Sequence, residues 1–86
     1  MLTIKQLRDK IDKTDADIIK KLSQRKTLSI KIGEMKSKLG KKVINNKREK
    51  ELMLRYEKLC LEYKLQATFI KKLFKIIIAN SRELQK

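Results

Sequence analysis

The feature that most constrains this chain is its almost unbroken helix-forming sequence. It contains no proline and only two glycines, Gly33 and Gly40, so most of its length holds nothing that would stop a helix. Apolar residues from Leu7 to Leu39 recur at spacings built from threes and fours, the pattern of one long amphipathic helix. Thr3 is suited to cap its start and Gly40 its end. The sequence therefore predicts an all-α fold whose first helix covers roughly residues 4–39.

Two shorter helices are predicted to follow. Asn45 or Asn46 begins the second one, over residues 46–63, and Asn46 with Glu49 has the spacing of a capping box. The apolar pattern then loses its phase for a few positions, which predicts a turn, and resumes in a third helix over residues 67–85. No internal repeat or linker-like tract divides the chain, so its 86 residues are expected to form one domain.

A first helix of this length cannot be buried by its own chain. About 36 residues extend roughly 54 Å, whereas a compact chain of this size has a radius of gyration of only about 12 Å. The helix would project from its own subunit and leave its apolar stripe in water. Charged residues interrupt the stripe, which argues against a plain coiled coil. We therefore expect a homodimer in which the long first helices pair.

Charge and composition exclude several classes of protein. Lys and Arg number 24 against 10 Asp and Glu, and the resulting net charge of +14 favours anionic ligands. The absence of His and the single Cys60 exclude a zinc site, a His-dependent nucleophile and an intrachain disulfide framework, so no metal or other cofactor is expected. The longest apolar run, residues 76–79, is far shorter than the ~20 residues of a membrane span. We expect a cytoplasmic protein without a membrane partner.

Two cations interrupt the inward-facing stripe of the first helix. Arg25 and Lys36 are separated by eleven positions, which places them about 20° apart around the helix and about 16 Å apart along it. Both can therefore point into one pocket, where two unpaired cations would bind an anion. The alternative is that each side chain snorkels outwards or pairs with a nearby carboxylate, as most lysines in so basic a chain would do.

Arginine is scarce among the basic residues, with five against 19 lysines. A guanidinium binds a carboxylate through two parallel hydrogen bonds and stays charged when buried, so arginine in a lysine-rich chain points to recognition of carboxylate or phosphate. Arg8 precedes Arg25 by 17 positions, about 25 Å along the helix and roughly 100° around it. One chain cannot bring both to the same small molecule. If they share a ligand, Arg8 comes from the partner chain.

Further polar residues lie in the second and third helices. Arg48 and Glu49 fall in the first turn of the second helix, where the helix dipole favours anions. Glu49 could accept a hydrogen bond from a ligand hydroxyl or serve only as a helix cap. Ser81 and Gln85 are four positions apart, hence on one helical face, and both can donate to an ether or carboxylate oxygen. Each of these features alone is common on protein surfaces.

In their order and spacing these residues resemble the all-helical AroQ class of chorismate mutases. The similarity covers nearly the whole chain and lies in the segments Leu7-Arg8-x-x-Ile11-Asp12, Leu22-x-x-Arg25, Ile32-Gly33-x-x-Lys36, Asn45-x-x-Arg48-Glu49 and Ile77-Ile78-x-x-Ser81-x-x-x-Gln85. The resemblance implies an intertwined homodimer of three-helix subunits with two active sites, each drawing on both chains. It also implies an enzyme of the shikimate pathway that rearranges chorismate to prephenate for aromatic amino acid biosynthesis.

The resemblance further implies how the substrate is bound. Arg25, Ser81 and Arg8 of the partner chain would bind the two carboxylates of chorismate, and Lys36 with Gln85 would hydrogen-bond its ether oxygen. A Claisen rearrangement needs neither a nucleophile nor a general base, which suits a chain without His. Holding the substrate in its reactive shape and stabilising negative charge on the ether oxygen would supply the catalysis.

Three residues near the start of the second helix complete the implied site. Glu49 would accept a hydrogen bond from the ring hydroxyl, and Arg48 would extend the positive wall of the pocket. Asn45 stands where an Asp is often found in the family. If that position acts through its backbone amide, Asn serves equally well.

Two other functions fit parts of the sequence. An isochorismate pyruvate lyase shares this fold and much of the cationic pocket, so the sequence separates it poorly from a mutase. A basic, helical nucleic-acid-binding protein would fit the net charge of +14. The chain has only four aromatic residues, and no helix-turn-helix spacing is recognisable. We therefore expect no nucleic-acid partner.

Overall fold

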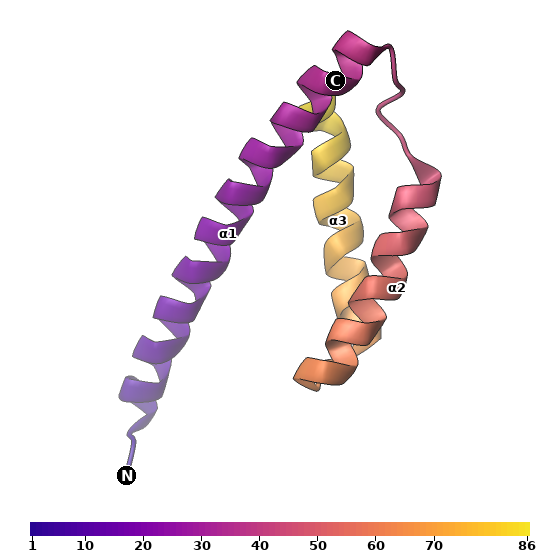
Figure 1. Cartoon of the computed structure of the whole chain (residues 1–86). Helices are drawn as coiled ribbons and strands as arrows, with labels where there is room; N and C mark the ends of the chain where they lie inside the picture. Colours follow the sequence, from indigo (N-terminus) through magenta and orange to yellow (C-terminus); the bar gives the residue numbers. More distant parts are fainter.

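The computed structural model describes residues 1–86 and contains three α-helices joined by two short connections (Figure 1). Helix α1 spans Ile4–Leu39, α2 spans Asn46–Tyr63 and α3 spans Ala67–Gln85. These bounds agree with the helices predicted from the apolar pattern and the caps. The chain contains no strand, so the all-α fold class is confirmed.

The two ends of α1 are formed as the sequence predicted. Thr3 caps the start: its hydroxyl accepts from the Gln6 backbone N–H at 3.1 Å, and the Gln6 side chain accepts from the Thr3 N–H at 2.8 Å. Gly40 ends the helix in the left-handed conformation, with φ of 66°. A residue with a Cβ is strained there, so glycine is the natural stop.

The start of α2 differs in part from the prediction. Asn45 is the N-cap, and its Oδ1 accepts from the Arg48 backbone N–H at 3.0 Å. The capping box predicted for Asn46 and Glu49 is wrong. Asn46 is already the first helical residue, and the Glu49 carboxylate is bound by Arg82 of α3 instead of turning back to the helix start.

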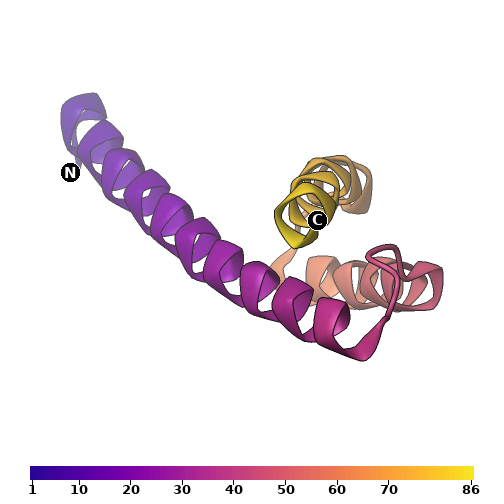
Figure 2. The ribbon, with the colours of Figure 1, turned by 90° about the horizontal axis from the view of Figure 1, so that it is seen from above.

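Helix α3 packs against both other helices, whereas α1 and α2 do not pack against each other (Figures 1 and 2). It runs in the same direction as α1, and α2 runs in the opposite direction. Between α2 and α3 the buried Tyr56, Cys60 and Ile78 form the apolar core, and the Tyr56 and Phe74 rings lie 4.2 Å apart between centroids. All packing between helices therefore involves α3.

The closest approach of α1 and α3 is at Gly33. A Cβ built on this residue would lie 2.6 Å from the Gln85 Cα and 3.0 Å from the Gln85 carbonyl oxygen. Gly33 and Ser29, one turn earlier, are the two buried residues of α1. The missing side chain thus lets the backbone of α3 lie directly against α1 at the level of Gln85.

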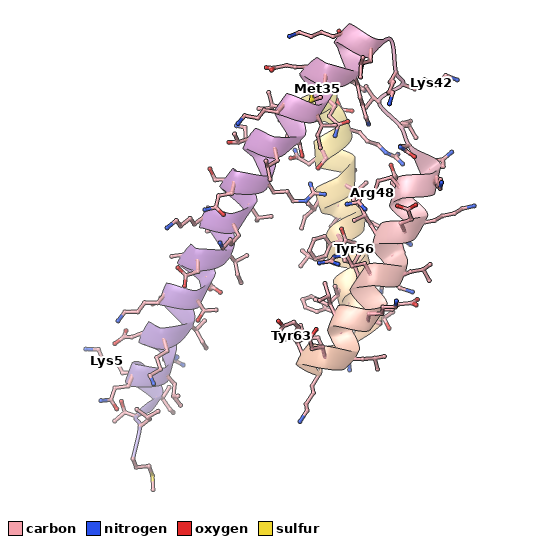
Figure 3. All side chains as sticks on the ribbon, in the orientation of Figure 1. Lys5, Met35, Lys42, Arg48, Tyr56 and Tyr63 are labelled. Carbon is pink, nitrogen blue, oxygen red and sulfur yellow. The ribbon has the colours of Figure 1, made fainter.

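The N-terminal half of α1, residues 4–24, projects away from the other helices (Figures 1 and 3). The molecule measures 58 × 24 × 16 Å, and its radius of gyration of 16.3 Å exceeds the about 12 Å of a compact chain of this length. Apolar side chains of this half, such as Ile11 at 57% and Ile18 at 53%, are more than half exposed. The prediction that the subunit cannot bury its own first helix is confirmed. None of the three helices combines the length and the apolar character that crossing a bilayer requires.

Candidate active site

One group of polar side chains lies where α3 faces the middle of α1. The Arg25 guanidinium donates to the Ser81 hydroxyl, and the Ser29 hydroxyl donates to the same oxygen at 3.3 Å. Ser81 in turn donates to the Ile77 carbonyl at 3.1 Å. Ser29 and Ser81 are both buried between α1 and α3. The bonds to Ser81 therefore hold the Arg25 guanidinium at the edge of this buried contact. A cavity of about 270 Å³ lined in part by Arg25 and Ser81 lies beside it.

A second group lies further along the same two helices, about three turns after Arg25 on α1 and about one turn after Ser81 on α3. The Lys36 ammonium donates to Gln85 Oε1 at 2.9 Å and to the Val43 carbonyl at 2.7 Å. Lys36 therefore ties α1 to α3 and to the connection between α1 and α2. Because Gln85 Oε1 accepts this bond, the amide NH₂ of Gln85 is left free to donate.

Arg25 and Lys36 of α1 meet only neutral oxygens within the chain. Arg25 contacts a hydroxyl, Lys36 contacts a carbonyl and an amide, and none of the chain's four ion pairs includes either residue. Both side chains turn towards α3, where their partners Ser81 and Gln85 lie four residues apart; that the two cations share one pocket stays a prediction. Neither Arg25 nor Lys36 pairs with a nearby carboxylate, which was the alternative that the sequence left open. Two positive charges remain available to an anion.

The α2 side of the site is occupied by Glu49, whose carboxylate binds Arg82 of α3. Arg82 Nε donates to Glu49 Oε2 at 2.9 Å, and a second bond joins Arg82 Nη2 to Glu49 Oε1. The hydrogen bond with Glu49 and the negative charge of that residue raise the pKa of Arg82 above its ordinary value, although desolvation opposes the change. Both residues line a cavity of about 450 Å³ between α2 and α3.

Three of the predicted residues are not joined to these groups within one chain. Arg8 lies in the projecting half of α1, about 42 Å along the helix axis from Lys36, and makes no ion pair. Arg48 is an exposed residue of α2, and its nearest acidic partner is Glu51 at 3.8 Å. The side chain of Asn45 is used in the helix cap, and its backbone N–H makes no hydrogen bond in the chain.

Two residues of the site were missed by the sequence analysis. Ser29 is four residues after Arg25 and seven before Lys36, so a small polar residue on the inward line of α1 was the available signal. Arg82 is one of the five scarce arginines and lies three residues before Gln85. Neither signal shows which partner the side chain binds.

The arrangement can bind a dianionic molecule and donate hydrogen bonds to an oxygen of it. Arg25 and Lys36 supply positive charge, Ser81 and Gln85 supply neutral hydrogen-bonding groups, and Glu49 supplies an acceptor. The thiol of Cys60 is buried in the apolar core between α2 and α3 and has no part in the site. Binding, orientation and electrostatic stabilisation are thus what these side chains offer.

Comparison with known proteins identifies the family of the chain. A model of the family "chorismate mutase type II" matches residues 7–86. The chorismate mutase of Methanocaldococcus jannaschii is 35% identical over 81 residues, which cover 94% of this chain and 82% of that protein. The bifunctional chorismate mutase/prephenate dehydratase of Buchnera aphidicola is 34% identical over 79 residues, covering 92% of this chain and 20% of that longer protein. The family match runs through all three helices, including Arg25 and Lys36 of α1 and their α3 partners Ser81 and Gln85, and the chain therefore belongs to the chorismate mutase type II family.

Proposed function

We propose that this chorismate mutase rearranges chorismate to prephenate by clamping the substrate between cations and stabilising charge on its ether oxygen. The observation that carries the mechanism is that Arg25 and Lys36 face one side of α3 with only neutral partners. No acidic side chain of the subunit pairs with these two cations, so a dicarboxylate would supply the negative charge that balances them. The family match supports the same substrate.

The carboxylates of chorismate are assigned to Arg25 and Ser81, with Arg8 from the partner chain. The Ser29 and Ile77 contacts hold Ser81 in place, and Ser81 holds the guanidinium. An arginine fixed in this way loses little rotamer freedom on binding, because its orientation is set beforehand. The clamp would hold the substrate in the folded shape from which the new carbon–carbon bond forms.

The ether oxygen is assigned to Lys36 and Gln85. The ammonium of Lys36 has three donors, of which two are used by Val43 and Gln85, so one remains. Gln85 offers its free NH₂. As the carbon–oxygen bond breaks, negative charge builds on the ether oxygen, and these two donors then bind the transition state more tightly than the substrate.

The ring hydroxyl of chorismate is assigned to Glu49. A carboxylate has about four acceptor positions, and Arg82 uses two of them, so two remain and a ligand hydroxyl can use one. Arg48 lies one residue away and would extend the positive wall, and the unpaired backbone N–H of Asn45 could face the same end of the ligand.

The assembly is proposed to be a homodimer whose long first helices pair. The apolar residues on the N-terminal half of α1 are exposed, and burial against a partner helix would remove them from water. Arg8, on the same half, is too far from Arg25 of its own chain to bind the same ligand. A partner helix lying along this row would bury it and bring its own Arg8 towards the site. Each of two sites would then use both chains.

The reaction is tested by following the purified protein with chorismate and, separately, with isochorismate by proton NMR. We expect prephenate from chorismate and little turnover of isochorismate. Release of pyruvate from isochorismate at a higher kcat/KM than prephenate formation would make the protein a lyase of the same fold and overturn the proposal.

The shared site is tested by mixing two inactive variants, Arg8→Ala and Arg25→Ala. After subunit exchange, half of the dimers are heterodimers, each with one intact site, so about a quarter of the wild-type activity should return. Each variant incubated alone is the control. Proven heterodimers without any recovered activity would contradict a site built from both chains.

A further inference from the structure

We propose that Arg82 is a positioning residue of the active site, which holds the carboxylate of Glu49 where it can accept the substrate hydroxyl. This inference rests on the proposed chorismate mutase reaction and assigns a role within the same site. It concerns a residue that lies outside the set of ligand-binding groups described above.

The contact between the two side chains is specific in its geometry. Two parallel hydrogen bonds join the guanidinium edge of Arg82 to both oxygens of Glu49. The Glu49 side chain is 24% exposed and that of Arg82 36%, so the pair is more covered than the Arg48–Glu51 pair, whose side chains are 60% and 53% exposed. A fully exposed single-bonded pair contributes little to structure, whereas a bidentate, half-buried one fixes the plane of the carboxylate.

The position of Arg82 on α3 connects it to the rest of the site. It follows Ser81 directly and precedes Gln85 by three residues, so these three side chains leave α3 within about 100° of one another. Ser81 and Gln85 contact α1, and Arg82 contacts α2. Because α1 and α2 do not pack against each other, the distance of Glu49 from Lys36 and Gln85 depends on how α3 packs against both helices, together with the Lys36–Val43 bond to the connection before α2.

A second ion pair between α2 and α3 provides a matched control. Lys71 binds Glu57 near the opposite end of α3, about 16 Å along the helix from Arg82. Both pairs join the same two helices, but only the Arg82 pair involves a residue assigned to the ligand. The change in kcat/KM after loss of the Lys71 pair therefore measures the effect of looser packing between α2 and α3 alone.

The experiment compares kcat/KM for chorismate in the variants Arg82→Met, Arg82→Lys, Lys71→Met, Glu49→Gln and the double variant Arg82→Met/Glu49→Gln. We expect Arg82→Met to lower kcat/KM about tenfold, and Arg82→Lys to recover part of this loss because it keeps one charged donor. Lys71→Met should stay within about twofold of the wild type. In the Glu49→Gln background, Arg82→Met should cause no further loss, because Arg82 acts through Glu49.

Three results would overturn the inference. Equal losses in Arg82→Met and Lys71→Met would make Arg82 a packing residue only. Losses that multiply in the double variant would mean that Arg82 contacts the substrate independently of Glu49. An unchanged kcat/KM in Arg82→Met would leave the pair without a role in the reaction.

Two checks separate these outcomes from other failures. If Arg82→Met does not fold, as judged by circular dichroism, the same non-additivity with Glu49→Gln is expected for Arg82→Lys, with a smaller single loss. The wild-type protein provides the second check: if it fails to convert chorismate, the proposed function is wrong, whereas an active wild type with an unaffected Arg82→Met variant refutes only the role of Arg82.

Discussion

The two halves of α1 belong to one continuous helix, yet they differ in almost every tertiary contact. In the C-terminal half, residues 25–39, Ser29 and Gly33 are buried against α3, and Arg25 and Lys36 bond to α3 or to the following loop. In the N-terminal half, residues 4–24, every residue is exposed. The apolar spacing is the same in both halves, and its side chains are exposed in both, with Ile32 at 47% and Met35 at 62%; what α3 covers in the C-terminal half is the small residues Ser29 and Gly33.

This difference shows what an apolar stripe does and does not specify. The stripe marks the side of a helix that is to be covered, because exposed apolar area costs about 25 cal/mol per Å² relative to burial. It does not say whether the cover comes from the same chain. The proposed site relates the stripe to ligand binding through Arg25 and Lys36 in the half that packs on α3 and Arg8 in the projecting half.

The largest expected effect comes from placing a charge in the uncovered row. Ile11→Lys changes an exposed residue and should leave the subunit fold intact. If a partner chain covers this row, the change should abolish dimer formation and with it nearly all chorismate turnover, because each site then lacks the Arg8 of the partner. Sedimentation and activity at one protein concentration measure both.

The control for this change is Asp9→Asn, which raises the net charge equally from the opposite side of the helix and should alter neither property. A monomeric and fully active Ile11→Lys protein would show that the N-terminal half of α1 needs no partner chain for activity. It would also contradict the shared site.

The second effect concerns the covered half. Lys36→Met keeps most of the apolar stem and removes the charge, so kcat should fall at least about a hundredfold, the scale of losing an oxyanion-type donor. Steady-state kinetics separate kcat from KM. If only KM rises, Lys36 belongs to an anion-binding wall and does not act on the transition state.

A smaller and pH-dependent effect is expected for Gln85→Glu. At neutral pH the new carboxylate accepts from Lys36 as Gln85 does but repels the charge that develops on the ether oxygen, so activity falls. As the pH is lowered the group protonates and becomes a donor, and activity should rise relative to the wild type. The ratio of kcat values, variant to wild type, across the pH range measures this. A ratio that stays constant with pH would show that position 85 does not contact the ether oxygen.

The smallest effect is expected on stability, from Gly33→Ala. The added methyl group would meet Gln85 Cα at 2.6 Å, so α3 must move away from α1. Such overpacking costs about 1–3 kcal/mol, against a gain of about 1 kcal/mol in helix propensity. Urea unfolding at one fixed chain concentration should show a net loss of stability. A gain would mean that the two helices separate easily at this point.

Much of the fold was predictable because the features that define it are local. The helix ends depend on groups within four residues of each other, such as Thr3 with Gln6, or on the backbone of one residue, as at Gly40. The alignment of Arg25 with Lys36 follows from the 100° turn per residue of any α-helix. The projecting first helix follows from its length alone, and the residue pattern was specific enough to indicate the family.

The remaining features depend on where α3 lies, and residues far apart in the chain decide them. The spacing of Asn46 and Glu49 fits a capping box, but Arg82, 33 residues after Glu49, offers two charged donors and binds the carboxylate instead. The Ser29–Ser81 bond and the contact of Gly33 with Gln85 likewise join residues 52 positions apart. Local patterns determined the helices and their ends, whereas the polar partners that join one helix to another were decided by the packing of α3, because hydrogen bonds between helices depend on the relative position of the helices and not on spacing along one of them.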